Sequence, residues 1–159
     1  MTGSTKLTTD FQLTSPLFID GATIPLRFTC RGDNINPTLQ ITGAPKSTES
    51  LALVMHDPDA VTADWVHWLL WNMPPDTTEI LEGSEPFQAI EGTTSFGKPG
   101  YGGPCPPRGT GTHHYIFEVY ALDKSLELLS SATREDLLIE MKGHVLAQAI
   151  LVGLFKADE

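Results

Sequence analysis

Five polar side chains end or interrupt segments that are otherwise apolar, and their placement is the main indication of function. Asp57 and Asp59 directly follow one apolar segment, and His67 lies within a second. His113 and Tyr115 begin a third, where strand alternation puts them on one face and the adjacent histidine on the other. Imidazole and phenol groups can donate hydrogen bonds to an oxyanion, and a carboxylate can orient an imidazole. The pattern therefore indicates a site for a small anion.

A loop rich in glycine and proline is the second component of the predicted site. Residues 101–111 hold four glycines and three prolines. Each proline fixes its φ and lacks an N–H, so the main-chain donors left nearby are those of Gly102, Gly103, Cys105 and Arg108. A stiff loop with a few directed N–H groups suits phosphate or carboxylate, with the imidazoles adding charge-assisted bonds when protonated.

Three apolar segments predict the strands that must position these residues. Segment 51–56 is apolar up to its last residue and ends before a proline, which cannot continue a central ladder. Segment 115–122 is rich in aromatic and β-branched residues, which favour strands. Segment 65–71 has large apolar residues on both faces, and strict alternation places on one face Trp65, His67, Leu69 and Trp71.

The remaining segments predict further strands and a small helical part near the C-terminus. Residues 11–41 mix short apolar stretches with turn residues, which favours strands joined by tight turns. Good helix formers predict a helix over 134–142 that is capped by Thr133. We also expect a second short helix over 144–148 and a last strand over 150–155, so the fold is mainly β.

Composition and charge narrow the class of protein. The 159 residues are 40% hydrophobic and 19% charged, which fits one folded domain spanning residues 1–159. A net charge of −10 argues against nucleic-acid binding and against docking on anionic membranes. Residues 1–10 lack the apolar stretch of a signal peptide or membrane helix, so we expect a cytoplasmic location. Cys30 and Cys105 are expected to be thiols there, although a single bridge between them stays open.

The order and spelling of the motifs resemble the phosphatidylethanolamine-binding, or Raf kinase inhibitor protein-like, family, and its bacterial and archaeal branch in particular. The matching blocks span nearly the whole chain and include Asp57-Pro-Asp-Ala60, His67-Trp68, Gly102-Gly-Pro-Cys-Pro-Pro-Arg-Gly109 and His113-His-Tyr115. The resemblance implies an antiparallel β-sandwich with a large central sheet and a smaller sheet. It also implies a pocket for phosphate-like groups such as a phospholipid head group.

The resemblance also implies which residues line that pocket. These are similar in position to Asp57, Trp65, His67, Pro106, Pro107, His113 and Tyr115, with the amide of Cys105 as a donor. The residue pattern itself adds Asp59 and Gly103 to the predicted ligand-binding set. Two residues depart from the family pattern. Val61 stands where the family usually has proline, and His114 replaces the usual arginine, which removes a positive charge near the site.

Three functional hypotheses remain open at this point. The first is a binding protein for a small anion, with no catalytic residue, metal or cofactor. The second is an inhibitor of a kinase or serine protease, roles the family resemblance also implies, as it does a signalling modulator and a homodimer. The third is a thiol enzyme in which Cys105 is the nucleophile and His67 or His113 its base. Metal binding is disfavoured because His56 and Asp57 should point to opposite faces of their strand.

Overall fold

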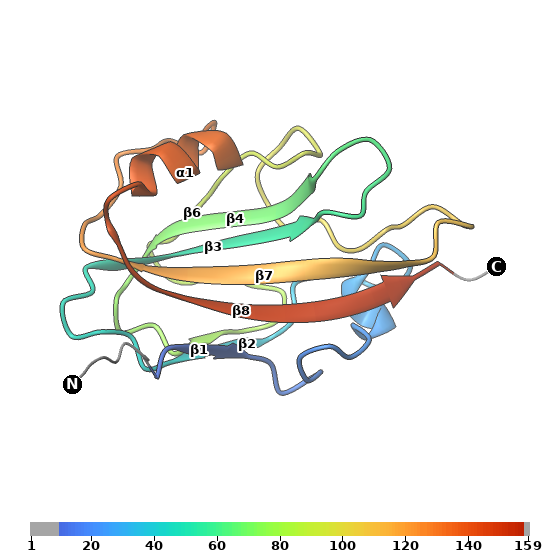
Figure 1. Cartoon of the computed structure of the whole chain (residues 1–159), viewed down its shortest axis with the longest axis horizontal. Helices are drawn as coiled ribbons and strands as arrows, with labels where there is room; N and C mark the ends of the chain where they lie inside the picture. The colour runs from blue at the N-terminus through green and yellow to red at the C-terminus, as the bar shows by residue number, and fades with distance from the viewer. Residues whose placement is uncertain (1–9, 158–159) are drawn as a thin grey trace, which may run out of the picture.

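Two antiparallel β-sheets form the frame of the protein, as the computed structural model shows for residues 10–157 (Figure 1). The larger sheet has the strand order β6 (Ile90–Glu91), β4 (Trp65–Met73), β3 (Ser50–Asp57), β7 (Thr112–Leu122) and β8 (Val145–Lys156). The smaller sheet has the order β1 (Gln12–Thr14), β2 (Leu39–Thr42) and β5 (Glu79–Ile80). The predicted mainly β architecture with a large and a small sheet is confirmed.

The N-terminal part contains less strand than its turn residues predict. Between β1 and β2 the described chain forms a short 3-10 helix, η2 (Leu26–Phe28), and otherwise irregular connections. The segment beside η2 does reach the large sheet, because Thr23 forms an isolated parallel bridge with Leu154 of β8. The expected series of strands joined by tight turns is therefore wrong for most of residues 15–38.

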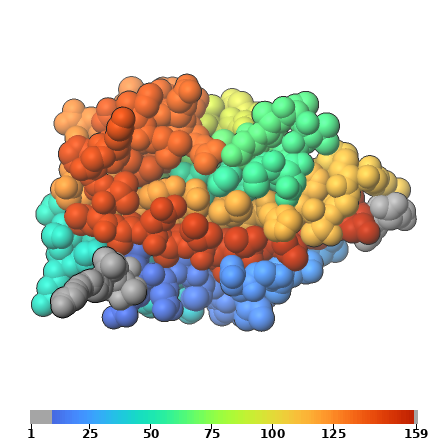
Figure 2. Space-filling model, in the orientation of Figure 1, coloured from blue at the N-terminus to red at the C-terminus, as the bar shows by residue number. Residues whose placement is uncertain are grey.

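The C-terminal part contains one of the two expected helices. The helix α1 (Arg134–Met141) is capped by Thr133, whose side chain accepts from the Asp136 N–H while the Asp136 carboxylate accepts from the Thr133 N–H. The short helix expected over 144–148 is wrong, because these residues begin β8 and pair with β7. Ala147 and Ala149 are buried between exposed neighbours, a period of two that sheet pairing satisfies. In Figure 2, α1 and β8 cover much of the near face of the molecule.

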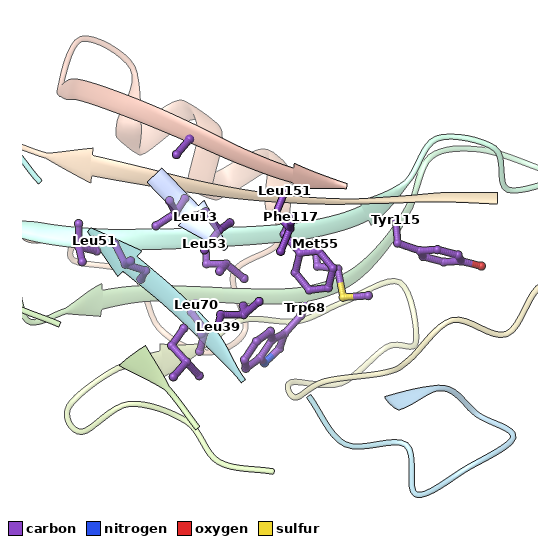
Figure 3. Packing of buried hydrophobic residues seen from close by; sticks show 14 of the residues in the cluster. Leu13, Leu39, Leu51, Leu53, Met55, Trp68, Leu70, Tyr115, Phe117 and Leu151 are labelled. Carbon is purple, nitrogen blue, oxygen red and sulfur yellow. The ribbon is translucent and has the colours of Figure 1, made fainter. Parts of the chain in front are cut away.

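Each face of the large sheet buries a separate apolar cluster. Leu51, Leu53 and Met55 of β3 and Phe117 of β7 face the small sheet and share a cluster with its Leu13 (Figure 3). Ala52 and Val54, on the opposite face, pack with residues of α1. Because side chains alternate along a strand, Asp57 continues the face of Met55 and His56 continues the face of Val54. The two sheet faces thus separate these adjacent polar residues.

A β-bulge interrupts β4 where it pairs with the end of β3. Met55 lies opposite Trp68, but His56 lies opposite Val66, so β4 has one extra residue at His67. The bulge reverses the alternation of side chains. Trp68 and Leu70 face the small sheet, whereas Leu69 and Trp71 pack on the α1 side. The prediction that Trp65, His67, Leu69 and Trp71 share one face is therefore wrong.

A disulfide bond joins Cys30 to Cys105 across 75 residues, with a Cα–Cα distance of 5.4 Å. The expectation of two thiols is wrong, and the hypothesis of a Cys105 nucleophile fails because the bonded sulfur has no thiolate to offer. Disulfides persist mainly in oxidising compartments, so the bond speaks against the expected cytoplasmic location, which stays a prediction. Within residues 10–157, α1 is the only α-helix, and no helix is long and apolar enough to cross a membrane.

The disulfide gives the first testable expectation. Replacing both Cys30 and Cys105 by serine should lower the free energy of unfolding by about 2–5 kcal/mol, because the cross-link restricts a long loop of the unfolded chain. Urea denaturation measures the change. As a control, a reducing agent should lower the midpoint of the unsubstituted protein and leave that of the double variant unchanged. Equal midpoints for the two proteins without reductant would contradict the assignment.

Candidate functional site

A cavity of about 390 Å³ opens at one end of the large sheet, where β3, β4 and β7 meet the Gly/Pro-rich loop. It brings together eight of the ten residues predicted for the site, namely Asp57, Trp65, His67, Cys105, Pro106, Pro107, His113 and Tyr115. The other lining residues are Ala60, Val61, Thr62 and Phe96. Segments that are far apart in the sequence therefore converge on one small space.

A buried hydrogen bond between Asp57 and His113 fixes one side of the cavity. The Nδ1 of His113 lies 2.7 Å from the Oδ2 of Asp57, and the two side chains are only 2% and 4% exposed. The other carboxylate oxygen of Asp57 accepts from the N–H of Asp59 at 2.8 Å, which holds the turn after β3. Nε2 of His113 lies 2.9 Å from the hydroxyl oxygen of Thr110. The imidazole is thus held at both ring nitrogens.

His67 reaches the cavity from the bulge in β4. Its Nδ1 lies 2.6 Å from the carbonyl oxygen of Gly102, so Nδ1 must carry a proton and donate it. Nε2 is then the ring atom left for a ligand. Burial lowers the pKa of His67, although the bond to Gly102 and the charge of Asp57 oppose the shift. The neutral form therefore prevails at neutral pH, with Nε2 as an acceptor.

Tyr115 carries a buried hydroxyl that has no hydrogen-bond partner among the described residues. Its ring stacks on His113 at 6.3 Å and meets His67 edge-on at 5.3 Å. Figure 3 shows the ring beyond Phe117, with its oxygen directed away from the apolar cluster. Burial raises the pKa of Tyr115, and the charge of Asp57 and the nearness of its carboxylate to the hydroxyl raise it further, so the phenol stays protonated. Unpaired buried hydroxyls are rare and call for an explanation.

Aromatic rings form an apolar wall of the cavity beside His67. Phe96 meets both Trp65 and His67 edge-on, with ring centroids 5.5 and 5.4 Å apart. Sequence reasoning missed Phe96, because it lies in a turn outside any predicted strand and only the folded chain brings it to His67. Thr110 was also missed, although it belongs to the Gly/Pro-rich loop.

The Gly/Pro-rich loop is held in place by the segment around η2. The N–H of Gly103 donates to the side-chain oxygen of Asn34 at 2.8 Å, and the hydroxyl of Tyr101 donates to the carbonyl of Phe28 at 2.7 Å. A Cβ on Gly103 would lie 2.3 Å from that carbonyl oxygen, so only glycine fits. The N–H of Gly102 donates to the carbonyl of His67. These contacts and the disulfide fix the loop beside the cavity.

Two of the ten predicted site residues do not line the cavity. Gly103 does not line the cavity, because its N–H is taken by Asn34. Asp59 does not line it either, since its carboxylate accepts from the N–H and Nδ1 of His114, at 2.8 and 2.7 Å. His114 thus lies with Asp59 and away from the cavity. Among residues 10–157, no group of three or more His, Cys, Asp or Glu side chains is placed so that it could hold a metal ion, and His56 pairs with Asp64 on the other side of the sheet.

Comparison with known proteins identifies the family. Residues 14–156 match the family model described as phosphatidylethanolamine-binding protein. The chain belongs to the phosphatidylethanolamine-binding protein family. Among its relatives, the UPF0098 protein PH1269 of Pyrococcus horikoshii is 45% identical over 149 residues, which cover 89% of this chain and 75% of the relative.

Solved structures of the phosphatidylethanolamine-binding protein family share the whole fold. The homologue CT736 of Chlamydia trachomatis superposes with a TM-score of 0.90 at 36% identity and covers 95% of this chain and 100% of its own. YbcL of Escherichia coli, described as a new member of the mammalian family, gives a TM-score of 0.87 at 29% identity over 94% and 99% of the two chains. The resemblance inferred from the motifs is confirmed.

The buried pair in this family member gives a second testable expectation. Asp57→Asn should lower the free energy of unfolding by about 3–5 kcal/mol, because the amide can accept from His113 or from the Asp59 N–H but not from both. Asp59→Asn is the matched control, since its pair with His114 is largely exposed and should cost about 1 kcal/mol or less. Urea denaturation of both variants makes the comparison. Similar losses for the two would refute the special role of Asp57.

Proposed function

We propose that the cavity binds a small oxyanion of the phosphate type, such as the head-group phosphate of a phospholipid, without changing it chemically. The observation that carries this proposal is the unpaired hydroxyl of Tyr115, which is buried against the two histidines at the cavity. An anionic oxygen would supply the missing acceptor. The N–H of Cys105, and Nε2 of His67 once it is protonated, would supply two further donors, since neither has a hydrogen bond among the described residues.

The charge balance of the cavity favours an anion that binds together with a proton. Asp57 is the only acidic side chain that lines the cavity, and His113 already donates to it. Neutral His67 presents a lone pair at Nε2, which would repel an anionic oxygen. Protonation turns this nitrogen into a charge-assisted donor. We therefore infer that the ligand and a proton on His67 enter together.

The apolar wall favours a ligand with an uncharged part next to its anionic group. Trp65, Phe96 and Val61 give the cavity an apolar part of its lining, and Val61 and Phe96 are exposed to solvent. A phosphate ester fits this division better than a free polyanion. The family name supports the same class of ligand. Inhibition of a kinase or serine protease, a signalling role and a homodimer stay predictions.

The role of His67 can be tested by direct binding. His67→Ala should weaken the binding of inorganic phosphate or phosphoethanolamine by about tenfold or more, because a charge-assisted hydrogen bond is lost. Isothermal titration calorimetry gives the Kd. His144→Ala is the matched control, because His144 pairs with Asp123 outside the cavity and should leave the Kd unchanged. No binding at millimolar ligand to the unsubstituted protein would refute the proposal.

The proton linkage predicts the sign of the pH dependence. Because the pKa of His67 is lowered, its protonated form is scarce near pH 7, and an anion that needs this form should bind more tightly as the pH falls. The gain in affinity should level off once the pH is below the lowered pKa of His67. Sulfate is the suitable probe, since its own charge stays constant from about pH 8 to about pH 5. His67→Gln should flatten the dependence, and an unchanged slope would contradict the linkage.

A further inference from the structure

We propose that Thr110 is a built-in competitor of the ligand. Its hydroxyl forms a hydrogen bond with the Nε2 of His113 in this structure, and an oxygen of a bound anion replaces the hydroxyl there. The inference rests on the proposed function, because it concerns the same cavity. It makes Thr110 a specificity-determining residue that decides which ligands can use both imidazoles.

The two histidines of the cavity differ in the hydrogen bonds they have left to give. Nδ1 of His113 is bound to Asp57 at 2.7 Å and its Nε2 to Thr110 at 2.9 Å, so the ring has no free nitrogen. His67 uses Nδ1 for Gly102 and has no partner for Nε2 among residues 10–157. A ligand can therefore reach His67 directly. It can engage His113 only by displacing the Thr110 hydroxyl.

The loop around Thr110 is built so that this displacement is easy. Gly109 and Gly111 flank it with φ values of +82° and +80°, and a Cβ on either would meet nothing within 4 Å. Arg108 and Thr110 are both exposed, so no core packing holds this turn. The Thr110 hydroxyl donates its hydrogen to the carbonyl of Pro107 at 2.6 Å, so it accepts from Nε2 of His113 and keeps its own acceptor when it leaves. Displacement thus costs one hydrogen bond and strands no polar group.

Competition with a hydroxyl selects the chemical class of the ligand. A neutral alcohol or sugar offers His113 an oxygen no better than that of Thr110 and gains nothing by replacing it. An anionic oxygen forms a hydrogen bond roughly twice as strong as a neutral one and therefore wins the exchange. A tetrahedral phosphate ester has further oxygens for His67 and Tyr115. We infer that Thr110 keeps neutral ligands from the second imidazole.

Removing the hydroxyl tests this inference. Thr110→Val keeps the branched shape and frees His113, so inorganic phosphate should bind about fivefold more tightly, the equivalent of one neutral hydrogen bond. Thr110→Ser keeps the hydroxyl and should restore the original Kd to within about twofold. Thr112→Val is the matched control, because Thr112 lies two residues away at the start of β7 and, unlike Thr110, forms no side-chain hydrogen bond with His113. Calorimetry at one pH compares the four proteins.

Each outcome decides between the proposals. If the unsubstituted protein binds phosphate and Thr110→Val binds it equally or more weakly, the competitor role is overturned and the anion site stands. If only Thr110→Val binds, the competitor role is supported, and anion binding by the unsubstituted protein is overturned. If neither protein binds, both are overturned. A nuclear magnetic resonance titration adds a second measurement, because displacement should shift the amide signals of Gly109 and Gly111. A response of Gly102 alone would show that Thr110 stays in place and would overturn the inference.

Discussion

The hydrogen bond between Asp57 and His113 is the constraint on which the site depends. It joins the end of β3 to the start of β7 inside the protein, where a carboxylate without a partner would be costly. The pairing fixes the ring of His113, and Tyr115 stacks on that ring. Asp57 also orders the turn that brings Ala60, Val61 and Thr62 to the cavity. This one interaction between β3 and β7 thereby positions both the residues that follow β3 and the polar side chains of His113 and Tyr115.

The Gly/Pro-rich loop, which forms another part of the cavity lining, is held by residues that do not themselves line the cavity. Asn34, Phe28 and Cys30 hold the Gly/Pro-rich loop through a side-chain acceptor, a backbone carbonyl and a disulfide. The prolines leave few torsions free, so the loop loses little entropy when a ligand binds. After Pro107 the loop has no further proline, and two glycines with positive φ flank Thr110. Donors in the proline-rich part and the hydroxyl of Thr110 therefore lie next to each other in the same loop.

The sequence predicts much of this arrangement where simple periodicity decides. Alternation along β7 correctly places His113 and Tyr115 on one face, and the apolar run of β3 correctly predicts a buried strand that delivers Asp57. Periodicity fails at His67, because the bulge that turns it into the cavity depends on pairing with β3. The position of Gly103 and the bond between Cys30 and Cys105 depend on distances between remote segments. Residues 144–148 show how pairing with β7 overrides local helix preference.

The disulfide connects the redox state of the solvent with the proposed ligand site. Cys105 lines the cavity, and its bond to Cys30 anchors the wall that carries the N–H donor. Coupling between two sites is reciprocal. If the disulfide raises the affinity for a ligand, the bound ligand makes the disulfide harder to reduce by the same free energy. If the proposed anion binds at this wall, the reduction potential of the bond shifts with ligand occupancy, and thiol reagents and the ligand act as opposing effectors of one equilibrium.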